Sequence, residues 1–353
     1  MTRTLVWDAA PGETRCLLLD DDQPVALHLL RDCHAAPSAP AGARVMARLM
    51  GRLDQGRGLI RLDSGEEAIL QPLPKIAEGA RLMVDITRER VPEPGQWKRA
   101  LARPADADTP PLPDARTRLV AQADRVLCPD IASAEALGPV ACPVEIDAAA
   151  VAALDMDLLL DAARSGLFPF ADGVLSIERT RAMTVIDVDG TLPPRALNCA
   201  AAQAIARALR LFAITGPIGI DFVSMDNRAD RQAVDAALAA ACADLGAHER
   251  TAINGFGFCQ IIRPRLGPSI AEQLCATTPG RLSPESQALA LLRMAVTSTG
   301  VGARHITARP PVIDLLRSWP DALARVRQRL GTDVKLVSDP AQSGYGHVHV
   351  SPA

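Results

Sequence analysis

Three consecutive segments decide the fold: residues 181–190 (RAMTVIDVDG), 194–213 (PRALNCAAAQAIARALRLFA) and 216–225 (GPIGIDFVSM). The first and third are short and rich in apolar residues, which is typical of strands buried in a sheet. The second repeats Ala, Leu and Ile at helical spacing and starts with prolines, so it predicts an α-helix. A strand, a helix and a strand with short joints predict two parallel strands linked by a right-handed crossover.

Acidic side chains follow Ile on both predicted strands. Asp187 lies in VIDV and Asp221 in GIDF, each toward the end of its strand, where open α/β sheets build their sites. If the strands are neighbours in register, these carboxylates lie close together, repel each other and favour a bound Mg²⁺ or Mn²⁺. Asp189 faces the same side, so we expect a cluster of three carboxylates. Arg263 and Arg265, in IIRPRLGPS, are candidates for gripping a phosphate near that metal.

The segments before this unit predict strands and a small barrel. Residues 2–30 alternate as a hairpin and a third strand, and residues 36–42 form a linker. Residues 41–103 contain short Gly-separated strands, with 12 Lys and Arg against 8 Asp and Glu, which favours an oligonucleotide-binding barrel. Residues 104–115 form a Pro-rich linker, and residues 105–165 carry 11 acidic against 4 basic side chains. Nucleic acid would avoid that acidic surface.

The composition excludes several classes of protein. The chain has 353 residues, of which 48% are hydrophobic and 22% charged, with a net charge of -3, as in ordinary globular proteins. No apolar run reaches the roughly 20 residues of a membrane span. The first residues are not typical of a signal peptide, so we expect a cytoplasmic protein. Its 8 cysteines include no C-x-x-C pair, so they are expected to be buried apolar residues.

From about residue 154 to 272 the chain resembles the catalytic region of the ribonuclease E/G family. The stretch ending in VIDVDG is similar to the family's I-D-[VI]-N-S-G strand, and LNCAAAQAIARALRLFA to its N-x-x-A-A helix. GPIGIDFVSM is similar to G-G-x-I-x-I-D-F-I-D-M, and GFGFCQIIRPRLGPSIAE to the family's motif with R-x-R-x-x-P-S. Four motifs in the same order make this resemblance specific.

The resemblance implies an α+β chain of several subdomains. An RNase H-like segment (1–37, continued after a linker in 104–175) is interrupted by an S1-type OB β-barrel (38–103). A DNase I-like α/β catalytic subdomain (176–280) and a small C-terminal α+β domain (281–353) follow.

The resemblance also implies the site and its chemistry. Asp187 and Asp221 become the Mg²⁺-binding catalytic carboxylates, and Asp189 takes the place of an Asn that orients metal or water. Arg263, Arg265 and Asn198 fall on RNA-contacting positions. The implied activity is endonucleolytic hydrolysis of single-stranded RNA in processing or decay, leaving 5′-phosphate and 3′-hydroxyl ends.

The chain departs from the family pattern in four places. Asp189 replaces the family's Asn, and Gly255 replaces an Arg. No segment matches the family's 5′-monophosphate sensor, so we expect no 5′-end sensing. Only Cys275 falls near the family's C-P-x-C link, so neither zinc nor a zinc-linked dimer is expected, and the oligomeric state stays open.

Two alternatives stay open at this point. A non-catalytic RNA-binding relative would explain the departures, whereas the retention of both Asp187 and Asp221 disfavours it. VIDVDGTL also matches the first motif of haloacid-dehalogenase-like phosphatases, which would make Asp187 a nucleophile and Asp189 a general acid. That family needs a later lysine, and only Lys335 follows the motif.

Overall fold

The structure is a computed structural model that describes residues 2–36, 38–106 and 108–351. The chain forms two compact units, one made of residues 1–36, 115–156 and 281–353, the other of 37–114 and 157–280. The predicted domain ends at residues 1, 37 and 353 lie outside the described residues. None of the described helices is long and apolar enough to cross a bilayer.

The first unit contains a five-stranded sheet. Its order is β12-β11-β1-β2-β3, so the N-terminal hairpin and third strand have the predicted antiparallel pairing, and the later β11 runs parallel beside β1. Asp130 and Asp147 cap helices α2 and α3 by accepting from Ser133 N and Ala150 N. The elements of this part are β1 (Arg3–Ala10), β2 (Glu13–Asp20), β3 (Gln23–Arg31), α1 (Ala115–Val120), β11 (Arg125–Cys128), α2 (Ile131–Leu137), β12 (Val144–Ile146) and α3 (Ala148–Ala153).

The C-terminal segment belongs to the same unit. Ser283 caps its first helix, and Pro284 follows at the first helical position, as the sequence predicts. Its core also buries Cys33, the second residue after β3. The elements are α8 (Pro284–Thr297), β19 (Arg304–Ala308), α9 (Pro310–Ser318), α10 (Pro320–Leu330), β20 (Val334–Ser338) and β21 (His347–Val350), with sheet order β20-β19-β21.

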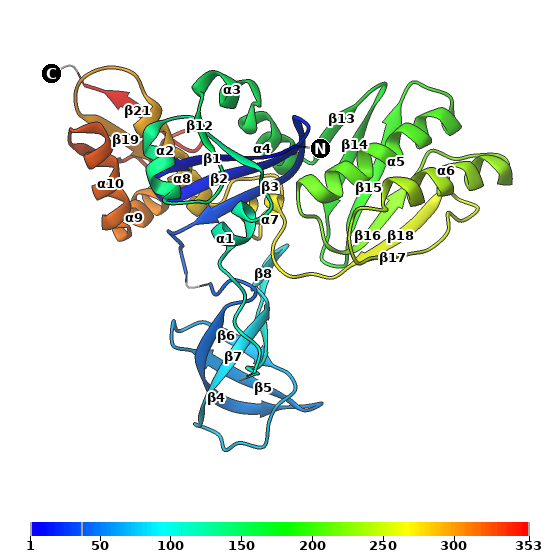
Figure 1. The fold of residues 1–353 in the computed structure, drawn as a ribbon, viewed down its shortest axis with the longest axis horizontal. Helices are drawn as coiled ribbons and strands as arrows, with labels where there is room; N and C mark the ends of the chain where they lie inside the picture. Colours follow the sequence, from blue (N-terminus) through cyan, green and yellow to red (C-terminus); the bar gives the residue numbers. More distant parts are fainter. Residues whose placement is uncertain (1, 37, 107, 352–353) are drawn as a thin grey trace. The chain divides into compact units, whose positions relative to one another are not determined.

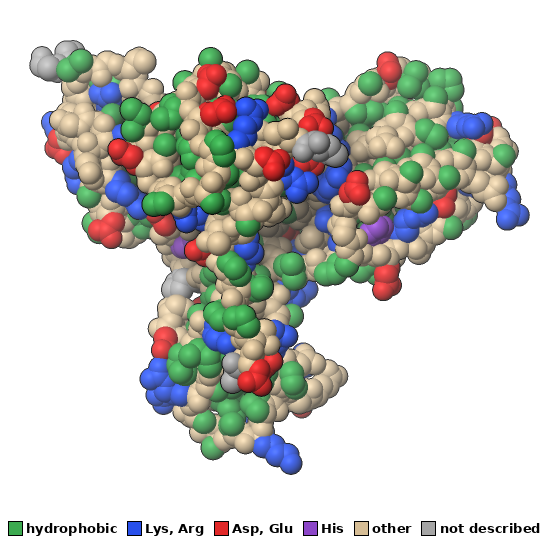
Figure 2. Space-filling view, in the orientation of Figure 1, with side chains coloured by type: hydrophobic (Ala, Val, Ile, Leu, Met, Phe, Trp, Pro, Cys, Tyr) green, Lys and Arg blue, Asp and Glu red, His purple; other side chains and the backbone are tan. Residues whose placement is uncertain are grey.

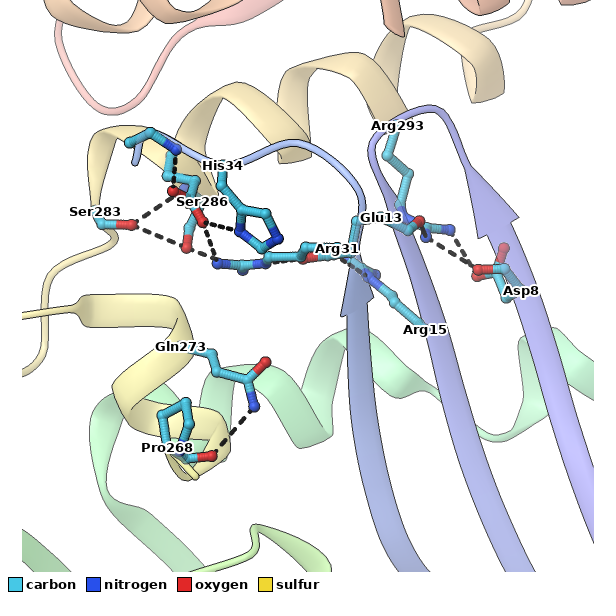
Figure 3. A network of polar contacts seen from close by, with 12 residues as sticks. Asp8, Glu13, Arg15, Arg31, His34, Pro268, Gln273, Ser283, Ser286 and Arg293 are labelled. Carbon is cyan, nitrogen blue, oxygen red and sulfur yellow. Dashed lines mark hydrogen bonds and ion pairs between the residues drawn. The ribbon is translucent and has the colours of Figure 1, made fainter. Parts of the chain in front are cut away.

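A buried polar network joins these two parts of the first unit. Arg31 donates to Glu13 Oε2 at 2.8 Å and to Ser286 Oγ at 3.1 Å, so it lies between β2 and α8 (Figure 3). Arg293 of α8 pairs with Asp8 of β1 at 2.7 Å. Burial raises the pKa of Glu13, but the attraction of Arg31, Arg15 and Arg293 outweighs it, so the pKa lies below its usual value.

The second unit begins with the predicted barrel. Five strands close in the order β10-β6-β5-β4-β7 around apolar side chains such as Leu49, Ile60 and Leu70. A short hairpin, β8–β9, extends from the barrel between β7 and β10 (Figure 1). The strands are β4 (Arg44–Leu53), β5 (Arg57–Leu62), β6 (Glu67–Leu70), β7 (Arg81–Arg88), β8 (Val91–Glu93), β9 (Gln96–Lys98) and β10 (Ala100–Pro104).

The second unit continues with a six-stranded sheet in the order β13-β14-β15-β16-β18-β17. The predicted pair β15 and β16 is parallel, and the crossover helix α5 packs on β13, β14 and β15 with α6 beside it (Figure 1). The elements are α4 (Met156–Ser165), β13 (Leu167–Phe170), β14 (Gly173–Arg179), β15 (Thr184–Gly190), α5 (Pro194–Leu211), β16 (Gly216–Asp221), α6 (Arg228–Ala241), β17 (Glu249–Arg250), β18 (Phe258–Arg263) and α7 (Ile270–Cys275).

Three boundaries differ from the expectations. The sheet already includes β13 and β14, so it starts before residue 176. The strand predicted over 251–263 begins only at Phe258, as β18. Asn254 Oδ1 accepts from Phe256 N and Phe258 N, which closes a turn before it. The strand expected over 216–225 ends at Asp221, the last residue of β16.

The cysteines behave as predicted. Six of the 8 are buried and the other two, Cys142 and Cys199, are half-buried. Burial raises the pKa of the Cys259 thiol to about 12, so it stays protonated at neutral pH.

Candidate active site

Asp187 and Asp221 lie directly opposite each other on adjacent parallel strands. They are register partners in the pairing of β15 with β16, and neighbouring strands are about 4.8 Å apart. Their chain neighbours Ile186, Val188 and Ile220 are buried, whereas both aspartates are exposed on the other face. The alternation of a strand therefore places two carboxylates side by side and open to solvent.

These two carboxylates have no protein partner among the described residues, either as hydrogen-bond acceptors or in ion pairs. Two facing carboxylates repel each other, and a divalent cation that binds their oxygens removes this repulsion. Mg²⁺ usually keeps several waters and takes only one or two carboxylates together with substrate phosphates. The donor set of Asp187 and Asp221 fits such an ion.

The expected cluster of three carboxylates is not formed. Within the described ranges, no three His, Cys, Asp or Glu side chains come together as a metal-binding group. Asp189 is exposed on the same face as Asp187 but pairs in register with Val174, on the strand away from Asp221. Two residues along a strand separate Asp189 from Asp187 by roughly 6.8 Å, which explains why it does not complete the group.

Asn198 is fully buried near the start of α5 and contacts main chain rather than the exposed face. Its Nδ2 donates to Val223 O at 2.7 Å, and its Oδ1 accepts from Val223 N at 3.1 Å. Both polar atoms of the Asn198 side chain therefore bond the main chain of Val223, two residues after Asp221. The structure corrects the expected RNA contact: Asn198 positions the segment that follows Asp221.

Arg263 does not lie beside the aspartates. It is the register partner of Gly216, whereas Asp221 pairs with Phe258 at the other end of the same ladder. Its guanidinium donates to the carbonyls of Leu209 and Ile214 at 2.7 and 2.5 Å, and burial lowers its pKa. The expected phosphate contact of Arg263 is thus corrected, because the side chain binds carbonyl groups at the end of α5.

Arg265 is also engaged within the protein. Its Nη2 makes a short ion pair with Glu272, which completes a capping box with Ser269 at the start of α7. The side chain of Glu272 is 10% exposed and that of Arg265 is 21% exposed. Neither predicted arginine is placed beside Asp187 and Asp221 by this structure.

An aromatic residue that sequence reasoning missed lies near Asp221. Phe256 is 86% exposed in the turn before β18. The next residue, Gly257, has φ +89° and accepts a hydrogen bond from Phe222 N, and a Cβ there would lie 2.6 Å from Phe222 O. The turn is therefore held against the residue after Asp221. In the sequence, the only indication of this exposed ring was a Phe within the turn-forming residues N-G-F-G.

A row of arginines crosses the outer face of the barrel. Arg48 of β4 is the register partner of Arg61 on β5 and of Arg81 on β7, and all three are exposed. Arg61 and Arg81 pair with Glu67 and Asp63, whereas no described residue pairs with Arg48. Figure 2 shows Lys and Arg among the surface side chains. These carboxylates offset the charges of Arg61 and Arg81, so Arg48 is the arginine of this row that favours an anionic partner.

Comparison with known proteins identifies the region that holds the aspartates. Residues 169–266 match the model of the Ribonuclease E/G family. Ribonuclease E of Nostoc sp. (strain PCC 7120) is 35% identical over 132 residues, which cover 33% of this chain and 19% of that protein. Ribonuclease G of Escherichia coli (strain K12) is 36% identical over 119 residues, which cover 30% of this chain and 24% of the relative.

The matches therefore span about a quarter or less of these relatives' own length. The match to the family model covers both Asp187 and Asp221, and it does not support the phosphatase alternative for Asp187 and Asp189. The strands, the helix and the two facing carboxylates agree with the predicted resemblance, and residues 169–266 of this chain match the model of the ribonuclease E/G family.

Proposed function

We propose that this chain is an endoribonuclease that hydrolyses single-stranded RNA and leaves 5′-phosphate and 3′-hydroxyl ends. The observation that carries the proposal is the unpartnered, in-register pair Asp187 and Asp221 within the ribonuclease E/G region. RNA processing or decay in the cytoplasm is the proposed setting.

Asp187 and Asp221 would hold one Mg²⁺ or Mn²⁺ ion, and zinc has no proposed role. When bound, such an ion polarises a phosphate oxygen and lowers the pKa of bound water. Asn198 fixes the main chain after Asp221, so it keeps one of the two carboxylates in place. Asp189 contributes negative charge on the same face rather than a third ligand.

The arginine row and Phe256 would bind the substrate. Arg48, Arg61 and Arg81 offer guanidinium groups to the RNA backbone. Phe256 offers an exposed ring on which an unpaired base can stack. Because no segment resembles a sensor for the 5′ end, we propose that cleavage does not depend on a 5′-monophosphate.

A second candidate is a non-catalytic RNA-binding protein. It is favoured by the engagement of Arg263 and Arg265 within the protein and by Asp189 at the position of the family's Asn. In this case the barrel would bind RNA and the aspartates would not support hydrolysis.

One experiment separates the two candidates. A labelled A/U-rich single strand is incubated with the protein in Mg²⁺, in Mn²⁺ and in EDTA, and both cleavage and retention in a gel are measured. Asp187→Asn and Asp221→Asn should each reduce cleavage at least about a hundredfold, or about 2.7 kcal/mol of barrier, while retention stays. Asp244→Asn, an exposed change after α6, serves as the matched control.

Retention without metal-dependent cleavage would favour the non-catalytic candidate. Wild-type cleavage by either Asn variant would show that the substituted aspartate does not hold the metal. Asp189→Asn restores the family's residue and should keep or increase the cleavage rate.

A further inference from the structure

A second candidate site lies at the start of β15 and β16, the end of β16 away from Asp221. This cavity of about 90 Å³ is lined by Lys98, Arg179, Arg181, Thr215, Arg265 and Glu272, among others. The β8–β9 hairpin reaches it, since Arg181 Nε donates to Pro94 O at 3.1 Å. Thr184 and Pro217 also line the cavity, three residues before Asp187 and four before Asp221, so roughly 10–13 Å of extended chain separates the two places.

Three buried donors at this cavity lack an acceptor among the described residues. They are Thr215 Oγ1, Arg179 Nη1 and Arg265 Nε. The side chain of Arg179 is only 10% exposed, and its Nη1 lies 3.7 Å from Glu272 Oε1, too far for a hydrogen bond. Buried donors are normally satisfied, so three of them around one cavity indicate a missing group that accepts hydrogen bonds.

The charged side chains around the cavity indicate that the missing group is an anion. Four cations line it, namely Lys98, Arg179, Arg181 and Arg265, against two carboxylates, Glu93 and Glu272. Burial lowers the pKa of Arg179 despite the opposing attraction of Glu272. Arg179 and Arg265 lie beside the carboxylates Glu93 and Glu272. The excess of two positive charges comes from Lys98 and Arg181, which are exposed, and it favours an anion at this cavity.

We propose that this cavity binds a dianionic phosphate group through Arg179, Arg265 and Thr215. A dianion matches the excess of two positive charges. A volume of about 90 Å³ exceeds the roughly 10–15 Å³ that one water needs on the same measure, so the cavity has room for a tetrahedral oxyanion. The group is either inorganic phosphate or the terminal phosphate of an oligonucleotide whose remainder stays outside. This site stands on its own residues, whether or not the chain cleaves RNA.

Thermal unfolding of the full chain is followed while sodium phosphate is titrated, with sodium chloride at equal ionic strength as the reference. Saturable stabilisation by phosphate alone is expected. Arg179→Met should weaken phosphate binding at least tenfold. Arg228→Met, an exposed change at the start of α6, should leave binding unchanged.

Thr215→Val is the deciding variant, because valine keeps the shape and removes the unpaired hydroxyl. Without phosphate it should unfold at the same temperature as the parent or higher, and its phosphate affinity should fall at least threefold. A loss of phosphate affinity without a loss of thermal stability distinguishes a specific site from a general effect of salt. No saturable effect of phosphate, or equal affinity in the parent, Thr215→Val and Arg179→Met, would overturn the proposal.

Two short oligonucleotides, one with a 5′-phosphate and one with a 5′-hydroxyl, identify the source of the group. Displacement of phosphate by the first alone would assign the cavity to a terminal phosphate, and it would contradict the 5′-end independence proposed above. Displacement by neither would assign the cavity to inorganic phosphate. Both outcomes support the site.

Discussion

Replacing Asn198 by Ala tests how the structure holds Asp221. The change removes two partly buried hydrogen bonds, from Asn198 Nδ2 to Val223 O and from Val223 N to Asn198 Oδ1. It leaves a main-chain N–H and a C=O without partners beneath α5. An unsatisfied buried group costs about 1–3 kcal/mol, so the pair predicts a loss of roughly 2–4 kcal/mol after partial relaxation and water entry.

Hydrogen exchange at the Val223 amide measures this effect locally. A loss of about 2.7 kcal/mol should speed its exchange about a hundredfold, since each 1.4 kcal/mol is a factor of ten. Cleavage should fall as well, because Asp221 lies two residues away on the same segment.

Asn227→Ala is the matched control. Asn227 Oδ1 accepts from Asp230 N at 2.8 Å and caps α6, so its loss should cost about 1 kcal/mol without slowing cleavage. If Asn198→Ala leaves both the exchange of Val223 and the cleavage rate at parent values, the positioning role of Asn198 is refuted.

Three further predictions concern RNA binding and pH. Arg48→Ala should weaken RNA binding for all sequences and reduce the slope of log K against log salt by about 1, as measured by fluorescence anisotropy; an unchanged slope would remove the arginine row from the interface. Phe256→Ala should weaken binding of single strands by about 1–3 kcal/mol whereas Phe256→Tyr should not, and equal behaviour of both variants would rule out stacking. The lowered pKa of Glu13 contributes stability above its unfolded pKa, near 4.5, that is lost as the pH falls through the folded value. Acid unfolding should therefore be less steep in Glu13→Gln, and an unchanged pH profile would count against the role of the Glu13 network.

The local pattern of the sequence was sufficient to predict the aspartate pair. Two short apolar runs and the helical spacing between them predicted strand, helix and strand, and the shared Ile-Asp placement indicated the pairing of Asp187 with Asp221 that the structure shows. The closed barrel followed from short strands separated by glycines. These features depend on residues that are close in the chain.

The contacts of Arg263 and Asn198 could not be predicted in the same way. Arg263 bonds carbonyl groups at the end of α5 because the end of β18 that carries it lies there, and such a tertiary contact is not visible in the local sequence. The same holds for the buried amide of Asn198, whose partner lies 25 residues away. Phe256 was missed because a single aromatic in a turn has no periodicity.

Both edges of the six-stranded sheet have a consequence for self-association. At one edge, β13 is four residues long and contains Pro169, which has no main-chain N–H to donate. At the other, β17 consists of Glu249 and Arg250 alone. Short, charged or proline-bearing edges discourage another strand from extending a sheet. We therefore expect crowded or partly unfolded copies of this chain to resist aggregation through this sheet, and any second copy that binds here to do so through side chains.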